Sequence, residues 1–206
     1  MTRLIKSLSV LVVLCVAALG LLLYYRAQHP PAIAVPNAGN GSPAEPEFKF
    51  TVLDPPQPAP ALAFTTRDGA PKTLADFRGR LVLVNFWATW CGPCVAEMPS
   101  LDRLQARLGS RLTVLAISED RRGGEVVDPF LAKLKLGDLA VYLDTRNRAL
   151  QTFGLVGLPT SILIDRDGRM VWRVEGGVDW TGADAAAKLA PYLTPPPDIQ
   201  RTSLTR

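Results

Sequence analysis

The sequence predicts a single α/β domain in which helices flank a mixed central sheet. Strand-like and helix-like segments alternate between about residues 61 and 195, a pattern typical of a sheet covered by helices. Residues 81–87 are apolar on both faces apart from Asn85, as expected of a central strand. The last two strand-like runs, at 160–164 and 169–174, enclose an Asp-Arg-Asp-Gly turn and predict a closing hairpin.

The remaining elements follow in order along the chain. Residues 60–66, the Asp68-Gly69 turn and Thr73-Leu74 predict a small N-terminal β-hairpin extension. From Pro93 to Leu108 the apolar residues recur at helical spacing, and Gly109 ends that helix. The pattern then predicts a strand at 112–117, a helix at 126–136, a strand at 141–143, a short helix at 146–153 and a final helix at 183–193.

Composition divides the chain into four parts. Nine of the 18 prolines lie between residues 30 and 60, which predicts an extended spacer rather than a loop inside a domain. We therefore expect a transmembrane anchor or signal at 1–26, a proline-rich spacer at 27–60, the folded domain at 61–195 and a polar tail at 196–206.

The first 26 residues have the pattern of a membrane-spanning helix. Residues 8–25 contain no charge, while Arg3 and Lys6 precede them and Arg26 follows. A helix of this length just spans a bilayer, and the positive-inside bias keeps the two leading basic residues in the cytoplasm. We therefore expect an uncleaved single-pass anchor, with the rest of the chain on the outer side. The Ala-Ile-Ala triplet at 32–34 leaves a cleaved signal as the alternative.

Charge and cysteine counts exclude several classes of protein. The net charge is +4, but basic residues form no block of five or more and do not interleave with aromatic ones, so we expect no nucleic-acid partner. Three cysteines are too few for a disulfide-built scaffold. Cys15 lies in the apolar run, which leaves Cys91 and Cys94 to be explained.

The motif Cys91-Gly92-Pro93-Cys94 lies where the central strand turns into a helix. At the start of a helix, free backbone N–H groups and the positive end of the helix dipole favour a thiolate, so Cys91 is the expected nucleophile. Cys94 lies within reach but further inside the helix, which suits the resolution of a mixed disulfide. Pro93 lacks an N–H, which costs nothing in a first turn, and it holds the second cysteine in place.

Three other interpretations of the cysteine pair find less support, and the first, a chance spacing, is opposed by the strand before the motif and the helix after it. A zinc site would need more ligands, but the third cysteine lies in the apolar run and the single histidine, His29, lies in the spacer. A purely structural disulfide between residues so close in the chain would constrain the unfolded state very little. We therefore expect a redox pair without a metal or another cofactor.

Pro159 begins the strand at 160–164, where a proline cannot donate to a sheet. Since cis peptide bonds occur almost entirely before proline, we expect a cis bond between Leu158 and Pro159. The backbone before Pro159 is then free to pair with an extended substrate segment that crosses the cysteines. An ordinary trans proline at a sheet edge is the alternative.

Several motifs together resemble one family. They are Phe-Trp-Ala-Thr-Trp-Cys-Gly-Pro-Cys at 86–94, Glu-Met-Pro at 97–99, Gly-Leu-Pro-Thr-Ser at 157–161, and Leu-x-Asp-Phe-x-Gly at 74–79 after the Asp-Gly turn. From about residue 50 to residue 193 the chain resembles thioredoxin-fold proteins of the TlpA/ResA type, the membrane-tethered thiol–disulfide oxidoreductases of bacteria. The residues around the cysteines alone would indicate only the thioredoxin superfamily.

The resemblance implies a thioredoxin fold and assigns roles by position. Cys91 would attack, Cys94 would resolve, and the two would form the redox-active disulfide, with Pro159 as the cis-proline beside them. The residues expected to contact the substrate are Trp90, Gly92, Pro93, Leu158 and Pro159.

Asn85 departs from thioredoxin, which has a buried aspartate at the matching place. The amide of Asn85 cannot take a proton from Cys94 as a carboxylate can. The resemblance suggests Glu119, at the end of the strand 112–117, as the acid in its place. A partly buried carboxyl near a thiol would have a raised pKa and could shuttle its proton. The alternative is that Glu119 lies in a solvated loop. Glu97, an acid early in a helix, is a weaker candidate for the shuttle, because stabilisation by the helix dipole is enough to explain it. We therefore expect the loss of its carboxyl to slow exchange less than the loss of the Glu119 carboxyl.

These expectations combine into one function. We expect an enzyme of the inner membrane whose catalytic domain faces the periplasm and reduces disulfides in client proteins, as cytochrome c maturation or copper-site assembly requires. Its partners would be a disulfide-containing client protein, a membrane thiol protein that donates electrons, and the membrane itself through the N-terminal helix. A thiol-dependent peroxidase and a non-catalytic anchored adaptor that binds client segments are the alternatives.

Overall fold

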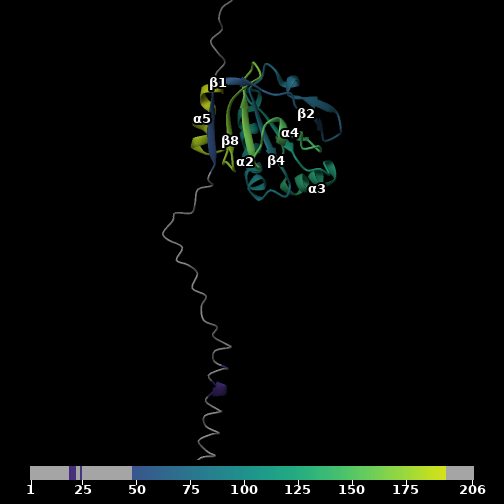
Figure 1. Cartoon of the computed structure of the whole chain (residues 1–206), viewed down its shortest axis with the longest axis vertical. Helices are drawn as coiled ribbons and strands as arrows, with labels where there is room; N and C mark the ends of the chain where they lie inside the picture. Colours follow the sequence, from purple (N-terminus) through teal and green to yellow (C-terminus); the bar gives the residue numbers. More distant parts are fainter. Residues whose placement is uncertain (1–18, 22–23, 25–47, 194–206) are drawn as a thin grey trace, which may run out of the picture. The chain divides into compact units, whose positions relative to one another are not determined.

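The computed structural model describes residues 19–21, residue 24 and residues 48–193. Between residues 48 and 193 an eight-stranded mixed sheet has the strand order β1-β8-β7-β4-β5-β6-β2-β3 (Figure 1). This arrangement confirms the predicted mixed sheet flanked by helices.

The centre of the sheet is β4 (Val82–Trp87), the strand predicted from its two apolar faces. It pairs in parallel with β5 (Thr113–Ser118) and antiparallel with β7 (Thr160–Ile164). All residues of β4 are buried. Asn85 is the one polar residue of the strand, so its side chain must find hydrogen-bond partners inside the core.

The outer strands extend the sheet in both directions. β8 (Arg169–Glu175) pairs with β7 as the predicted hairpin. On the other side, β6 (Ala140–Leu143) pairs in parallel with β5, and β2 (Ala63–Thr66) follows β6 antiparallel. β2 and β3 (Pro71–Thr73) form the predicted N-terminal hairpin, and the 3-10 helix Leu74–Phe77 follows it.

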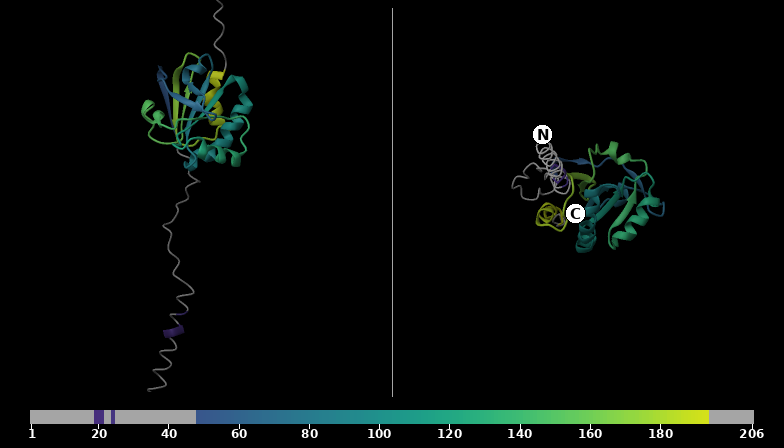
Figure 2. Two further views of the ribbon diagram at one scale, coloured as in Figure 1. Left: turned by 90° about the vertical axis from the view of Figure 1, so that its right-hand side faces the viewer. Right: turned by 90° about the horizontal axis from the view of Figure 1, so that it is seen from below.

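Helices cover both faces of this sheet (Figure 2). One face is covered by α2 (Gly92–Leu108), α3 (Gly124–Leu134) and α5 (Ala183–Leu193), whose buried residues join clusters with Leu83 and Trp87. The other face is covered by α4 (Arg148–Thr152) and the 3-10 helix, whose cluster contains Val84 and Phe86. Successive residues of β4 therefore anchor both layers, as the period of a strand requires.

The edge strand β1 (Lys49–Pro58) corrects the predicted domain boundary, because its prolines place residues 49–58 in the expected spacer. It pairs antiparallel with β8, and the pairing shifts between Val52 and Gln57, which leaves Pro55 and Pro56 outside the ladder. An edge strand tolerates prolines because one of its sides has no partner that needs backbone donors. The sheet therefore begins at residue 49 rather than after residue 60.

The predicted anchor at 1–26 lies outside the described residues apart from 19–21 and 24, which are helical. The predicted tail at 196–206 and the spacer before residue 48 lie outside them as well. Across the part of the chain that the structure describes, no helix is long and apolar enough to cross a bilayer.

Candidate active site

Cys91 and Cys94 lie at the start of α2 and are joined by a disulfide. Cys91 caps the helix, and its sulfur accepts a hydrogen bond from the backbone N–H of Cys94 at 3.3 Å. Pro93 lies in the first turn, where its missing N–H breaks no helical hydrogen bond. Cys91 is 6% exposed and Cys94 is fully buried, so an incoming sulfur reaches Cys91 first.

The cap position explains why Cys91 suits the role of nucleophile. A thiolate there faces the N–H groups that open α2 and the positive end of the helix dipole. Both favour the charged form of a sulfur at this position. The attacking role of Cys91 and the resolving role of Cys94 stay predictions that alkylation kinetics can test.

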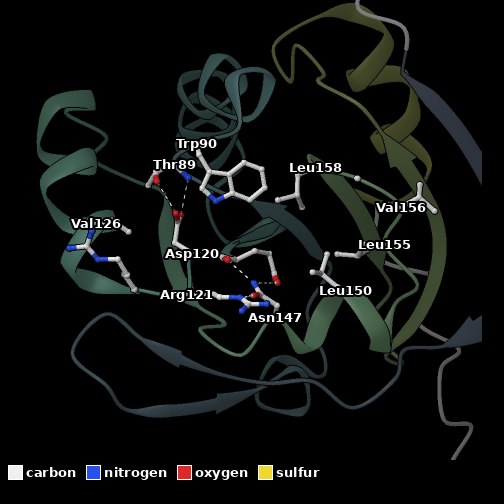
Figure 3. A pocket seen from close by; sticks show the side chains of 13 residues that line it. Thr89, Trp90, Asp120, Arg121, Val126, Asn147, Leu150, Leu155, Val156 and Leu158 are labelled. Carbon is white, nitrogen blue, oxygen red and sulfur yellow. Dashed lines mark hydrogen bonds between the residues drawn. The ribbon is translucent and has the colours of Figure 1, made fainter.

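Asp120, to which the sequence pattern did not point, holds the loop between β4 and α2. It is 4% exposed, and its carboxylate accepts hydrogen bonds from the N–H and the hydroxyl of Thr89 at 2.8 and 2.7 Å (Figure 3). The hydroxyl of Ser118 donates to the same carboxylate at 2.8 Å. Because Thr89 lies two residues before Cys91, these bonds fix the path of the chain into the redox motif. An acid just after the strand that neighbours β4 is the signal that could have revealed it.

Pro159 lies directly before β7, and its peptide bond with Leu158 is cis, as the sequence predicts. Thr160 is paired with Phe86 in the sheet, which brings the end of β4 next to the residues around Pro159. Leu158 packs against the buried cluster that contains both cysteines. The structure therefore brings the cysteine pair and the cis-proline to the same end of the sheet.

A groove of about 720 Å³ opens beside the redox motif. Trp90, which is 71% exposed, lies on one side together with Thr89 and Asp120 (Figure 3). The other side is apolar and is formed by Leu150, Leu155, Val156 and Leu158. Large exposed apolar side chains grouped around a hollow are typical of a surface that binds another molecule. The lining fits a polypeptide segment that passes beside the redox motif.

The residues expected to contact the substrate separate into three groups. Trp90 and Leu158 line the groove. Gly92 and Pro93 are exposed at the start of α2, and Pro93 lines a second cavity of about 320 Å³. Pro159 is buried, so it can act on a substrate only through the backbone geometry that it imposes.

Glu119 follows β5 and lines the groove, although only 3% of its surface is exposed. The side-chain amide of Asn147 donates to the backbone carbonyl of Glu119 at 2.6 Å and to its Oε2 at 3.2 Å. Burial raises the pKa of Glu119 to about 8, and the charges of Asp144 and Asp120 add to the rise, while the hydrogen bond from Asn147 opposes it. This burial excludes the solvated-loop alternative. The proton-shuttle role of Glu119 stays a prediction.

Glu97 is a second buried acid and lies one turn after Cys94 on the buried face of α2. It is 4% exposed; its Oε1 accepts from the amide of Asn85 at 2.6 Å, and its Oε2 accepts from the N–H of Val178 at 2.9 Å. Burial raises the pKa of Glu97 to about 7, and the hydrogen bonds from Val178 and Asn85 oppose the rise. A carboxyl with this pKa changes its protonation near neutral pH, as a group that takes a thiol proton must.

Asn85 connects β4 to the helix α2 and to the strand β7. Its amide donates to Glu97 on α2 and, at 2.9 Å, to the hydroxyl of Ser161 on β7. An amide and a carboxyl together therefore occupy the region where thioredoxin has a buried aspartate. The sequence signal for this pair is an amide in the central strand combined with an acid three residues after Cys94, and the helix-dipole explanation of Glu97 hid it.

Comparisons with known proteins agree with this geometry. The Redoxin family model matches residues 41–189. Thiol-disulfide oxidoreductase ResA of Bacillus thuringiensis subsp. konkukian (strain 97-27) is 34% identical over 119 residues, which cover 57% of this chain and 68% of that protein. The thioredoxin-like protein YneN of Bacillus subtilis (strain 168) is 44% identical over 62 residues, or 30% of this chain and 36% of that protein.

A solved structure shares the fold as well. The crystal structure of a protein assigned as the thiol:disulfide interchange protein DsbE from Chlorobium tepidum has a TM-score of 0.62 and 28% identity, and the match covers 68% of this chain and 97% of that one. The Redoxin match spans more than half of the chain, and the disulfide at the start of α2 supplies the reacting group. The chain therefore belongs to the Redoxin family and is a ResA-like thiol–disulfide oxidoreductase of the thioredoxin superfamily.

Proposed function

We propose that this enzyme reduces disulfides in client proteins on the periplasmic side of the inner membrane, where residues 1–26 hold it as a single-pass anchor. The observation that carries the proposal is the Cys91–Cys94 disulfide at the start of α2, with an apolar groove beside the more accessible sulfur. The uncharged run at 8–25 and the basic residues before it support the anchor and its orientation.

The reaction has two exchange steps. In the dithiol form, the Cys91 thiolate attacks one sulfur of the client disulfide; a mixed disulfide forms, and the other client sulfur leaves as a thiolate that takes up a proton. Cys94 then loses its proton and attacks the sulfur of Cys91. The Cys91–Cys94 disulfide forms, and the second client sulfur leaves as a thiolate and is protonated in turn. Two electrons pass from the enzyme to the client.

In this proposal the carboxylate of Glu97 accepts the proton of Cys94. Glu97 shares the buried face of α2 with Cys94, and its pKa of about 7 makes it half ionised near neutral pH. The hydrogen bonds from Asn85 and Val178 hold both carboxyl oxygens in place, so the base is positioned before Cys94 loses its proton. Glu119 is the competing candidate, and the two can be separated by mutation.

The direction of electron flow follows from the compartment. Disulfides persist outside the cytoplasm, so proteins there that need free thiols need a dedicated reductant. Cytochrome c maturation and copper-site assembly are processes of this kind, and the clients would be proteins that take part in them. A membrane thiol protein would return electrons to Cys91 and Cys94, and tethering by the anchor keeps the enzyme close to that donor. The dithiol chemistry itself needs no metal or cofactor.

Trapping the client tests the proposal. The full chain carrying Cys94→Ser cannot resolve the mixed disulfide, so we expect it to accumulate exported proteins linked through Cys91. The double variant Cys91→Ser, Cys94→Ser is the matched control and should capture none. Capture confined to cytoplasmic proteins would contradict the periplasmic site of action, and the absence of any mixed disulfide would contradict client reduction.

The two alternative functions can be tested with the same variants. A thiol-dependent peroxidase would consume hydrogen peroxide at a rate that depends on Cys91, whereas we expect no catalytic turnover of peroxide. A non-catalytic adaptor would keep its effect on clients after Cys91→Ser, whereas an oxidoreductase loses it.

A further inference from the structure

Two buried acids, Glu119 and Asp120, line the groove beside the redox motif, and a third, Asp144, lies close enough for its charge to act on Glu119. Glu119, Asp120 and Asp144 are 3%, 4% and 3% exposed. In the described part of the chain, the salt bridges are Arg67–Asp128, Arg122–Glu125 and Arg173–Glu175, so none reaches these three carboxyls. Burial raises the pKa of Glu119, and the charges of Asp144 and Asp120, which no described salt bridge offsets, raise it further.

Two of the three acids accept hydrogen bonds that account for their burial. Asp120 holds Thr89 and Ser118, as described above, and Asp144 accepts the N–H of Ala149 at the start of α4 at 2.8 Å. Glu119 is different, because Asn147 reaches only its Oε2 and no described residue donates to its Oε1. A buried polar atom without a partner destabilises a protein and calls for an explanation.

We propose that Glu119 is a specificity-determining residue that recognises a basic side chain close to the disulfide of the client. The inference rests on the proposed function, since it assigns the client segment to the groove that Glu119 lines. A lysine or arginine supplies the N–H donors that Oε1 lacks and a positive charge beside two groove carboxyls that no described salt bridge reaches. Its aliphatic stem lies along the apolar wall that Leu150, Leu155 and Leu158 form.

The site favours a cation over a neutral donor because it is shielded from water. Between buried groups the attraction of opposite charges is stronger than at the surface, and a hydrogen bond to a charged group is worth more than a neutral one. Binding of the cation would lower the pKa of Glu119, so the carboxyl would release a proton as it ionises.

Arg121 and Arg122 line the same groove but do not supply this cation. The Nε of Arg121 donates to Oδ1 of Asn147 at 2.9 Å, and the Nε of Arg122 lies 3.3 Å from Glu125 in an ion pair whose side chains are 71% and 72% exposed. Exposed charges are screened by water and salt. Both arginines therefore act at the rim of the groove, where they attract acidic groups more weakly than Glu119 attracts a base.

Peptide reduction by the full chain tests this assignment. The probes are synthetic peptides closed by one disulfide between two cysteines, with lysine, glutamine or glutamate placed in turn at each of the three positions on either side of the pair. The dithiol enzyme is mixed with each peptide, and the rate constant for peptide reduction is measured by chromatography of quenched samples. The readout is the ratio of rates for lysine and glutamine peptides, so any general effect of a variant on exchange cancels.

We expect the wild type to reduce one lysine peptide about tenfold faster than its glutamine match, the lower end of what one hydrogen bond between charged groups is worth. Glu119→Gln should bring the ratio close to one. The control Asp167→Asn, which removes an exposed carboxyl outside the groove, should keep the ratio.

Three results would overturn the assignment. They are a wild-type ratio near one at every position, a lysine preference that survives Glu119→Gln, and a preference for glutamate, which would show that Arg121 and Arg122 dominate. Failure of the wild type to reduce any peptide or protein disulfide would instead overturn the proposed function, and the specificity assignment with it.

Discussion

The buried carboxyl of Glu97 predicts a pH dependence of stability that a single substitution removes. Its pKa is about 7 in the folded protein and close to the ordinary value of 4.5 when the chain unfolds. Between these two values the folded state keeps a proton that the unfolded state releases. Glu97 therefore favours folding fully below pH 4.5, and this contribution is lost as the pH rises through 7.

The size of the effect follows from the two pKa values. The step from 4.5 to about 7 corresponds to about 3 kcal/mol, at about 1.4 kcal/mol for each pH unit. The glutamine of the Glu97→Gln variant cannot ionise, so the free energy of unfolding of this variant does not show the fall of about 3 kcal/mol between pH 4.5 and about 7. The glutamine offers one acceptor where Asn85 and Val178 both donate, so at pH 4.5 we expect the variant to be less stable by about 1 kcal/mol. The two curves should cross, with the variant about 2 kcal/mol more stable at pH 8.

Urea unfolding of the oxidised full chain in a mild detergent, repeated from pH 4.5 to 8.5, measures this difference. Glu119 also loses its proton in this range, but it is present in both proteins and its contribution cancels. The control is Glu125→Gln, whose exposed carboxyl should leave the pH dependence of the wild type unchanged. Parallel curves for the wild type and Glu97→Gln would show that the Glu97 carboxyl stays charged in the folded protein, and would refute the proton-acceptor role argued from its burial.

Three further predictions concern the redox pair and the domain. Cys91 should titrate below the free thiol value of about 8.5 and Cys94 should not, as alkylation rates against pH in the two single-serine variants would show; equal titration would remove the assignment of attacker and resolver. Residues 48–195 should fold and exchange disulfides without the preceding segment, and an insoluble product would show that the boundary is misplaced. Glu97→Gln should slow resolution of the mixed disulfide by about one to two orders of magnitude at pH 7 and Glu119→Gln by less, measured by stopped-flow mixing; the reverse order would return the shuttle to Glu119.

Local patterns were sufficient to predict most of the fold. The continuous apolar run at 81–87 forms β4, and the residues with helical spacing before Gly109 form α2. Both were predictable because the pattern of buried residues in each element can be seen from residues close together in the sequence. β1 was missed for the opposite reason. Its prolines have the composition of a spacer, and only its partner β8, more than 100 residues later, shows that they lie on a sheet edge where donors are not needed.

The same distinction separates the parts of the site that were predicted from those that were not. The cysteine pair and Pro159 are each marked by a local signal, namely a motif at a strand–helix junction and a proline before a strand. The partners of Glu97 are not, since Asn85 lies 12 residues before it and Val178 lies 81 residues after it. Asn147 likewise reaches Glu119 across 28 residues. Burial and hydrogen bonding of an acid depend on residues that only the folded chain brings together.

The positions of the two buried acids also bear on the order of the reaction. Cys94 must lose its proton while the client is still joined to Cys91, and at that moment the client covers the groove. A base that reached water only through the groove would be closed off when it is needed. Glu97 instead lines the second cavity, of about 320 Å³, with Pro93 and Gly177, and this cavity shares no lining residue with the groove. In the proposed mechanism, a proton passed from Cys94 to Glu97 therefore has a route through that cavity while the client occupies the groove. Resolution then need not wait for the client to move.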